Sequence, residues 1–506
     1  MAVVHRGSFA WARSILLLLF AFSSWASVNG LATGASTAPS PSIIVCQLKR
    51  VLSAESGVYV ANGLNLTDVD ILPRWNAFDA PIYTVYTKPA TIEDVQKIVL
   101  YASEYNIPFL ATGGGHGYTN TTSALKGGID IDLGAFKSIQ INSSKNTMTV
   151  GGSVTFSDIL DPLYAAGKEL PIGSCSCVGM NGAALGGGVG PYQGVHGLLL
   201  DNLLEVTIVT GQGEILTAST TQNADLFWGV RGAGFNFGIV VSAQYKIYDA
   251  LNGGNAYNGD FLYSADKAEA VFNLAAKFLV NQPDELSMFP SITFDQTTEQ
   301  TAVMMSVVYI GSVANGTQYM QAFADLNPFK QSVSVLPYNE LIKENRFGAD
   351  SQACTKGFDN AVYGSNVLEF DVATYVELVN DFNNFYTANP LIVALLVTEL
   401  FPHRVTELTP DAATAYPYRT NLGDNFVSFI FLNPLTAQQD SQVANTFALQ
   451  TRQKLIGKNP LSVYVNYAHG DEGPVAWYSS RKLPALHAIK SKYDPKNLFH
   501  FTNSFT

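Results

Sequence analysis

Apolar residues at helical spacing mark the first regular element of the chain. Four of them fall on one face of a helix predicted to begin near Thr91: Val95, Ile98, Val99 and Ala102. Thr91 can cap this helix, and Asp94 lies near the positive end of its dipole. Residues 107–111 then predict a short strand that leads into a glycine loop. This order is typical of an α/β unit whose ligand binds where regular structure ends.

Alternating apolar and polar residues predict further strands up to about residue 250. Such segments occur at residues 129–133, 147–150 and 239–245. A second capped helix is predicted from Thr155 to Gly167. Residues 205–209 and 214–217 are separated by a glycine turn and predict a hairpin.

The pattern changes after residue 250, where glycine becomes rarer. Amphipathic helices are predicted at residues 268–279 and 372–385, and long strands at residues 301–310, 391–398 and 426–432. This alternation favours an antiparallel sheet with helices on one face, so the fold class is α+β. The last fifty residues return to the earlier pattern, with a strand at 461–467 and a helix at 481–492, and we expect them to pack on the first part of the chain.

The N-terminus reads as a secretory signal. Arg6 and Arg13 flank a short polar region, an apolar stretch follows, and small residues near position 27 suit cleavage, so residues 1–27 are predicted to be removed. Four N-x-[ST] sequons predict glycosylation sites at Asn65, Asn120, Asn142 and Asn315, although such triplets also arise by chance. We therefore expect a secreted glycoprotein.

The net charge restricts the kinds of molecule that the protein is expected to bind. The chain has a formal net charge of −12, and loss of Arg6 and Arg13 with the signal leaves 27 basic against 41 acidic residues. Such an acidic surface repels nucleic acid and anionic membranes. It suits an uncharged or cationic small molecule.

Four cysteines in a secreted chain suggest disulfides. Cys175 and Cys177 are too close in sequence to bridge each other without strain, so Cys46 and Cys354 are the expected structural pair. The seven histidines show no metal-ligand spacing, and no metal site is predicted.

Two glycine clusters stand out from the rest of the chain. Residues 173–190 hold seven glycines and two cysteines in eighteen positions, and residues 113–117 hold four glycines around His116. Glycine at this density indicates bare backbone against a ligand or tight packing. Read alone, His116 is more often a structural histidine, and Cys175 a buried thiol or half of a disulfide. A phosphate loop, a zinc helix, a nucleophile elbow and a Rossmann fingerprint are all missing from the sequence.

Several motifs occur in the order and spacing of a known family. They are Gly114-Gly-His116, Gly173-Ser-Cys-Ser-Cys-Val-Gly179, Leu185-Gly-Gly-Gly188, Gly197-Leu-Leu-Leu-Asp-Asn202, Asp225-Leu-Phe-Trp-Gly-Val-Arg-Gly232, Phe237-Gly-Ile239 and Tyr493-Asp-Pro495. From about residue 75 to its end the chain thus resembles the berberine-bridge-enzyme-like FAD-linked oxidoreductases of the vanillyl-alcohol-oxidase superfamily.

The resemblance implies a domain organisation. A two-part PCMH-type FAD-binding domain would comprise residues 75–249 and a C-terminal segment, residues 455–506. An antiparallel-sheet substrate domain covered by helices, residues 250–454, would be inserted between them, and residues 28–74 would form an N-terminal segment.

The resemblance also implies FAD held covalently. The family's histidine after Gly-Gly, which bonds the flavin 8α-methyl group, corresponds to His116, and the cysteine that bonds ring carbon 6 corresponds to Cys175. Two departures weaken the cysteinyl link: Ser176 replaces the usual proline, and Asn181-Gly-Ala183 replaces Gly-Gly-His. The remaining cofactor contacts are expected from Gly114, Gly115, Gly179, Asn202 and Ile239.

Catalytic residues follow from the Tyr464-Val-Asn-Tyr467 motif. We expect Tyr467 to act as base beside Tyr464, with flavin or lysine charge needed to ionise a phenol of pKa about 10. A packed aromatic strand is the alternative. Tyr418 and Arg419 are expected to line the substrate pocket, although a surface loop is nearly as plausible for them.

The predicted activity is that of a secreted oxidase. A small organic substrate of secondary metabolism would be oxidised, by alcohol oxidation or oxidative ring closure, and O2 would be reduced to H2O2. Oligosaccharide oxidation, a dehydrogenase with another electron acceptor, and a non-catalytic carrier are the alternatives.

Overall fold

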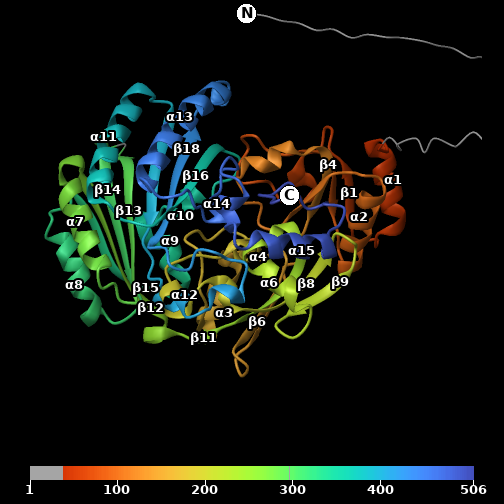
Figure 1. The fold of residues 1–506 in the computed structure, drawn as a ribbon, viewed down its shortest axis with the longest axis horizontal. Helices are drawn as coiled ribbons and strands as arrows, with labels where there is room; N and C mark the ends of the chain where they lie inside the picture. Colours follow the sequence, from red (N-terminus) through yellow and green to blue (C-terminus); the bar gives the residue numbers. More distant parts are fainter. Residues whose placement is uncertain (1–37, 296) are drawn as a thin grey trace, which may run out of the picture. The chain divides into compact units, whose positions relative to one another are not determined.

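The computed structural model describes residues 38–295 and 297–506 (Figure 1). The predicted signal at residues 1–27 lies outside these residues. The first sheet contains both parallel and antiparallel strands. The sheet has the order β1-β2-β4-β3, with β2, β4 and β3 parallel and β1 antiparallel to β2. Its strands are β1 (Gly57–Val60), β2 (Ile82–Lys88), β3 (Phe109–Thr112) and β4 (Lys126–Asp132). Helices α1 (Pro41–Val51) and α2 (Ile92–Glu104) pack on it through a shared apolar core.

A second, antiparallel sheet follows in the order β5-β6-β10-β8-β9. Its strands are β5 (Ile139–Asn142), β6 (Thr147–Gly151), β8 (Leu203–Thr210), β9 (Ile215–Ser219) and β10 (Gly238–Lys246). The predicted hairpin is confirmed, because β8 and β9 pair antiparallel. A two-stranded ladder joins β7 (Lys168–Glu169) to β11 (Tyr248–Asp249). The helices of this region are α3 (Phe156–Ala165), α4 (Met180–Gly186), α5 (Gln193–His196) and α6 (Ala224–Ala233).

The third sheet has seven antiparallel strands in the order β15-β12-β14-β13-β17-β18-β16 (Figure 1). They are β12 (Asn255–Ser264), β13 (Leu286–Asp295), β14 (Gln300–Tyr309), β15 (Lys330–Pro337), β16 (Asp359–Val367), β17 (Ile392–Glu399) and β18 (Gly423–Phe431). One face, here named the helix face, is covered by α7 (Ala268–Leu279), α8 (Val313–Ala324), α11 (Val372–Ala388) and α13 (Ala437–Ile456). The prediction of an antiparallel sheet with helices on one face is therefore confirmed.

The opposite face of this sheet, here named the site face, meets shorter elements. These are α9 (Tyr338–Gly348), which packs on β12 and β15, and the turn Val465–Tyr467, which packs on β16. The other short helices are α10 (Asp350–Ala353), α12 (Arg404–Glu407), α14 (Pro474–Tyr478) and α15 (Leu483–Tyr493). The C-terminal segment packs back on the first part of the chain, as expected: the Tyr493 hydroxyl donates to Asp225 of α6 (2.8 Å), and the Lys490 ammonium donates to the Asn236 carbonyl (2.8 Å). Among the described residues, the helices are too short or too polar to cross a bilayer.

The prediction of a strand at residues 461–467 is wrong. The backbone there is irregular and ends in a 3-10 turn, Val465–Tyr467. This segment lies on the site face of β16, where a Cβ on Gly364 would stand 2.5 Å from the Tyr467 carbonyl oxygen. Packing of a turn against a bare glycine, rather than strand pairing, therefore determines its course.

Candidate functional site

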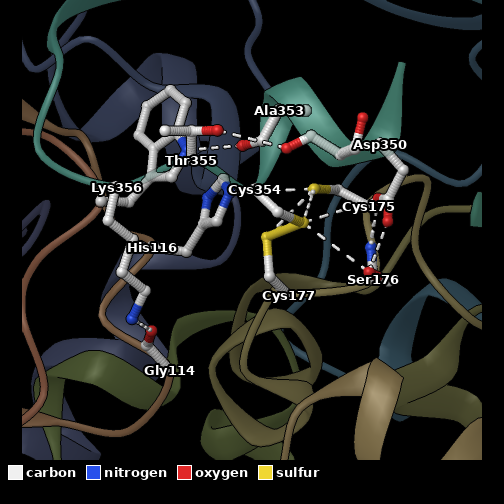
Figure 2. The surroundings of a disulfide bond; sticks show 12 residues. Gly114, His116, Cys175, Ser176, Cys177, Asp350, Ala353, Cys354, Thr355 and Lys356 are labelled. Carbon is white, nitrogen blue, oxygen red and sulfur yellow. Dashed lines mark hydrogen bonds between the residues drawn. A yellow bond between two sulfur atoms is a disulfide. The ribbon is translucent and has the colours of Figure 1, made fainter. Parts of the chain in front are cut away.

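The two glycine clusters come together, and their reactive side chains meet. The Cys175 sulfur lies 4.0 Å from Nε2 of His116, although 59 residues separate them in sequence. Figure 2 shows both side chains beside the α10 segment, which contributes Asp350 and Cys354. The structure thus brings together the two predicted flavin attachment residues.

His116 is held by an aromatic neighbour that the sequence did not single out. Its ring stacks on Trp75 with a centroid distance of 4.6 Å and an interplanar angle of 18°. The Trp75 indole donates to the Ala353 carbonyl (2.6 Å), and its backbone N–H donates to the Gly115 carbonyl (2.8 Å). Loss of solvent around the imidazole lowers the pKa of His116 to about 4, so the ring is neutral and nucleophilic at ordinary pH.

The expected disulfide between Cys46 and Cys354 is wrong. Cys354 is bonded to Cys177, while Cys46 is exposed on α1 as a free thiol. Sequence spacing excluded only a bridge between Cys175 and Cys177; it could not show that α10 returns to the glycine cluster. Cys175 remains free, and its sulfur lies 3.5 Å from each sulfur of the bond.

The environment of Cys175 keeps its thiol protonated. Burial, together with the negative charge of Asp350, raises the pKa of Cys175 to about 12. The carboxylate of Asp350 also accepts from the Ser176 backbone N–H (2.8 Å) and hydroxyl (2.5 Å). Ser176, at the position where the family has proline, thus ties the loop to α10.

The glycines of the two clusters are required by close backbone contact. A Cβ on Gly114 would stand 2.5 Å from the Gly179 nitrogen, and one on Gly179 would stand 2.8 Å from the Gly114 nitrogen. Gly115 also has a left-handed backbone with φ of +72°. Farther along the chain, a Cβ on Gly187 would stand 2.8 Å from the Tyr464 ring. The Gly186–Gly188 run therefore packs closely against the C-terminal segment.

A cavity of about 340 Å³ lies beside these loops, within the size range of ligand sites. It is lined by Gly113, Gly114, Ser153, Thr155, Cys177, Lys137 and Lys356, among others. The ammonium groups of Lys137 and Lys356 could hold the pyrophosphate of FAD, and binding would draw Lys137 from Asp158 (3.4 Å), which also lines the cavity. Ile239 lies on β10, the strand that packs against Gly152 at the edge of this region.

Asn202 does not offer a free donor to a cofactor. Both of its amide hydrogens are used, one by the His196 carbonyl (3.0 Å) and one by the Leu198 carbonyl (2.9 Å). Its own carbonyl accepts from Tyr248 (2.7 Å). The side chain therefore fixes the turn before β8.

Tyr464 and Tyr467 share one side of the segment because the backbone makes a 3-10 turn. In a strand, residues three apart point to opposite faces, whereas in a 3-10 turn they align. Their ring centroids are 4.9 Å apart. The Tyr464 hydroxyl accepts from the Gly188 N–H (2.8 Å) and from the Asn466 amide (2.6 Å), which fixes its position against the Gly186–Gly188 run.

Tyr467 pairs with a carboxylate that the sequence analysis missed. Its hydroxyl donates to Oε2 of Glu399 (2.8 Å), and the Ser174 hydroxyl donates to Oε1 (2.5 Å). Glu399 is fully buried at the end of β17. Burial and the charge of Glu399 raise the pKa of Tyr467 well above its usual value. The sequence feature that could have pointed to Glu399 is its place as a single glutamate at the end of an apolar strand.

Tyr418 and Arg419 both bond to distant parts of the chain. The buried Arg419 guanidinium makes a two-pronged ion pair with Asp201 (2.8 and 3.0 Å) and also donates to Thr414 (2.8 Å). The Tyr418 hydroxyl donates to the Ala476 carbonyl. Both residues connect the segment after α12 to other parts of the chain.

The four sequons differ in accessibility. Asn65, Asn142 and Asn315 are exposed. Asn120 is half-buried, and its amide hydrogen-bonds Nε2 of the buried His469 (3.0 Å). A glycan on Asn120 would have to replace that bond.

Comparison with known proteins identifies the fold and the family. Residues 83–219 match the family described as FAD binding domain, and residues 463–505 match the one described as berberine and berberine like. A FAD-linked oxidoreductase of Aspergillus niger, azaL, is 40% identical over 87% of this chain and 94% of its own.

Solved structures agree in fold. BBE-like 1 of Physcomitrella patens superposes with a TM-score of 0.78 at 21% identity, over 91% of this chain and 99% of its own. A glucooligosaccharide oxidase of Acremonium strictum, described with a novel flavinylation, gives a TM-score of 0.77 at 19% identity, over 92% and 98%. The chain belongs to the berberine-bridge-enzyme-like family of FAD-dependent oxidoreductases.

Proposed function

We propose that this protein is a secreted oxidase that removes hydrogen from an alcohol carbon of a neutral small molecule and passes the electrons to O2, with release of H2O2. The observation that carries the proposal is the Tyr467 and Glu399 pair, which is bonded to the hydroxyl of Ser174, the residue that precedes Cys175. A proton-accepting pair and the flavin attachment loop are thereby one connected structure.

Bound FAD supplies the hydride acceptor that the reaction needs. The chain supplies the proton path. A substrate hydroxyl placed against Tyr467 can donate its proton to the phenol oxygen while the phenol proton moves to Glu399, so Glu399 is the final acceptor. The phenol alone is too weak an acid to ionise, because its pKa is raised.

The environment of Glu399 sets the pH at which this path works. Burial raises the pKa of Glu399 above its usual 4.5, while hydrogen bonds from Ser174 and Tyr467 and the nearby charge of Arg346 oppose that effect. The carboxylate must be ionised to accept a proton. Activity is therefore expected to fall as pH is lowered through this raised pKa.

His116 is the primary attachment residue in this proposal, and Cys175 the second. A neutral imidazole is ready to react, whereas a thiol with a pKa near 12 is protonated at ordinary pH. Their separation of 4.0 Å lets both reach the same edge of one ring system.

Export is supported by the sequence features already described. The N-terminal apolar segment, the acidic balance and three exposed sequons at Asn65, Asn142 and Asn315 fit a secreted glycoprotein. A disulfide between Cys177 and Cys354 also suits an oxidising compartment.

The test begins with the absorption spectrum of the purified protein. Yellow colour that stays with the pellet after acid precipitation, and a flavin-modified peptide containing residue 116, are expected. His116→Ala and Cys175→Ala separate the two links. Colour wholly in the supernatant would refute covalent attachment.

A peroxide assay then decides the chemistry. Alcohols and oligosaccharides are offered in parallel, and H2O2 formation with alcohols only is expected. Strong H2O2 formation with oligosaccharides would refute the preference for alcohols over oligosaccharides as substrates. A flavin that is reduced by substrate but stays reduced for minutes in air refutes the oxidase assignment in favour of a dehydrogenase.

A further inference from the structure

Three polar side chains form a row across the site face of the seven-stranded sheet. Glu399 of β17 lies directly opposite Asp424 of β18, and Asp424 lies directly opposite Asn366 of β16. Residues opposite each other in antiparallel strands project from the same face. Because Glu399 bonds Tyr467, Asp424 and Asn366 face the same side as the catalytic pair.

Two members of this row lack hydrogen-bond partners. Asn366 is 2% exposed, and neither its amide nitrogen nor its carbonyl oxygen is bonded. Asp424 is 6% exposed, and its Oδ1 is likewise unpaired. Buried polar atoms are nearly always paired in folded proteins, so orphaned atoms gathered beside a reaction site need an explanation.

On the helix face of the same strands, a buried polar side chain has its hydrogen-bond partners. Asn425, the next residue along β18, accepts from the Thr398 hydroxyl (2.6 Å) and from the Tyr375 hydroxyl (3.0 Å). Asn425 on the helix face is therefore fully used as an acceptor, whereas Asp424 and Asn366 on the site face keep unpaired atoms.

We propose that Asp424 and Asn366 form a subsite for a second hydroxyl group of the substrate, distinct from the hydroxyl that is oxidised. This inference rests on the proposed alcohol oxidase function and specifies its substrate. A hydroxyl both donates and accepts one hydrogen bond, so it can satisfy the carboxyl and the amide together.

Charge excludes the other common polar groups. A substrate carboxylate would be repelled by Glu399. An ammonium ion would need an ionised carboxylate in direct contact, whereas burial and the charge of Glu399 raise the pKa of Asp424 well above its usual range and so favour its neutral form. A neutral carboxyl and an amide select a neutral group.

The strand spacing gives the distance between the two hydroxyls. The midpoint between Asp424 and Asn366 lies one and a half strand spacings, or about 7 Å, from Glu399. The reacting hydroxyl lies against Tyr467, whose own hydroxyl is 2.8 Å from Glu399, so the two substrate hydroxyls are separated by a comparable distance. Phe426 follows Asp424 by two residues on the same face, and its ring lies 5.0 Å from that of Tyr467. A six-membered ring with hydroxyl-bearing carbons at opposite ends fits this geometry.

Thermal unfolding tests the subsite without any ligand or turnover. A binding residue with unpaired atoms weakens the free protein, whereas a structural one stabilises it. Asn366→Leu and Asp424→Leu are expected to raise the apparent Tm by roughly 1–3 °C. The matched control Asn425→Leu removes the acceptor of the Thr398 and Tyr375 hydroxyls on the helix face, so this variant is expected to lower the Tm. A fall in Tm for Asn366→Leu as large as that of the control overturns the proposal.

Binding is tested with a set of para-substituted benzyl alcohols under anaerobic conditions: the rate of flavin reduction in the intact protein is followed against alcohol concentration, and its half-saturation gives the apparent dissociation constant. 1,4-Benzenedimethanol is expected to bind at least about tenfold more tightly than 4-methylbenzyl alcohol, since one good hydrogen-bonding pair is lost. Asn366→Leu should abolish the difference. Equal binding in the wild type, tighter binding of 4-(aminomethyl)benzyl alcohol, or failure of the diol to bind overturns the hydroxyl assignment.

The two experiments separate this inference from the oxidase proposal. If the protein releases no peroxide but the Tm and binding results hold, the oxidase assignment fails and the subsite stands. If peroxide is formed while the diol and its methyl analogue behave alike, the subsite fails and the oxidase assignment stands.

Discussion

The three sulfurs beside His116 predict unequal effects for substitutions at the two ends of one disulfide. Cys354→Ser leaves Cys175 and Cys177 without a partner across the fold. Cys177→Ser leaves Cys354 with Cys175, whose sulfur already lies 3.5 Å away. A replacement bond between Cys175 and Cys354 is therefore expected in the second variant only, in protein prepared without flavin, where the Cys175 thiol is free.

The loop length gives the magnitude. The native bond closes a loop of 177 residues, and the chain-entropy relation assigns such a loop about 5 kcal/mol of stability. The compact unit Ala38–Thr506 has an unfolding entropy of about 1 kcal/mol/K. Cys354→Ser should therefore lower the Tm by about 5 °C, whereas Cys177→Ser should lower it by only about 1 °C, because the replacement loop of 179 residues is nearly as long.

Two measurements check this prediction. Differential scanning calorimetry gives the Tm values, and alkylation of free thiols followed by peptide mass analysis under non-reducing conditions gives the bonds. The double variant Cys175→Ser/Cys177→Ser is the control and should match Cys354→Ser. Equal Tm values for Cys177→Ser and Cys354→Ser, or alkylation of both Cys175 and Cys354 in Cys177→Ser, would refute the reasoning.

Three further predictions concern the catalytic pair, a buried acid and a glycine contact. Glu399→Gln should lower kcat/KM by about 10²–10⁴-fold and remove the acid limb of the pH profile, since that carboxylate accepts the proton; a variant that keeps the limb contradicts this role. Burial raises the pKa of Asp130 to about 7, so the folded state binds more protons than the unfolded one and stability falls as pH rises from 4 to 7. Asp130→Asn should accordingly raise the Tm more at pH 8 than at pH 5, and equal shifts at both pH values would exclude the raised pKa as the cause. Gly114→Ala places a Cβ 2.5 Å from the Gly179 nitrogen and should reduce both Tm and bound flavin, measured by calorimetry and the ratio of absorbance at 450 and 280 nm. Gly182→Ala on α4, where a Cβ meets nothing within 4 Å, is its control, and similar losses in both variants would show that the loop contact is not responsible.

The secondary structure was largely predictable where pattern and packing agree. The helix beginning near Thr91 is α2, with Thr91 accepting from the Asp94 N–H as its cap (3.2 Å). The strand at 461–467 was mispredicted because its alternating apolar residues fit both a strand and a segment packed between two layers. Only the contact with Gly364 decides between them.

The site was predictable in part, through motifs that place chemistry at fixed positions in the sequence. His116 and Cys175 were found this way, and the structure brings them to 4.0 Å. Trp75 and Glu399 were not found, because neither lies in a glycine motif and each acts through a partner distant in sequence: Ala353 for Trp75, and Tyr467 for Glu399.

The sequence by itself determined the fold class, the family and the cofactor, because these depend on local periodicity and on motifs whose order survives without coordinates. Only the tertiary structure decided which cysteines bond, which carboxylate serves Tyr467, and that Arg419 is an internal ion pair. The physical reason is that these depend on long-range pairing of single side chains, which leaves no periodic trace along the chain. The unpaired Asp424 and Asn366 belong to the same class, since an absent partner is visible only when every neighbour is in place.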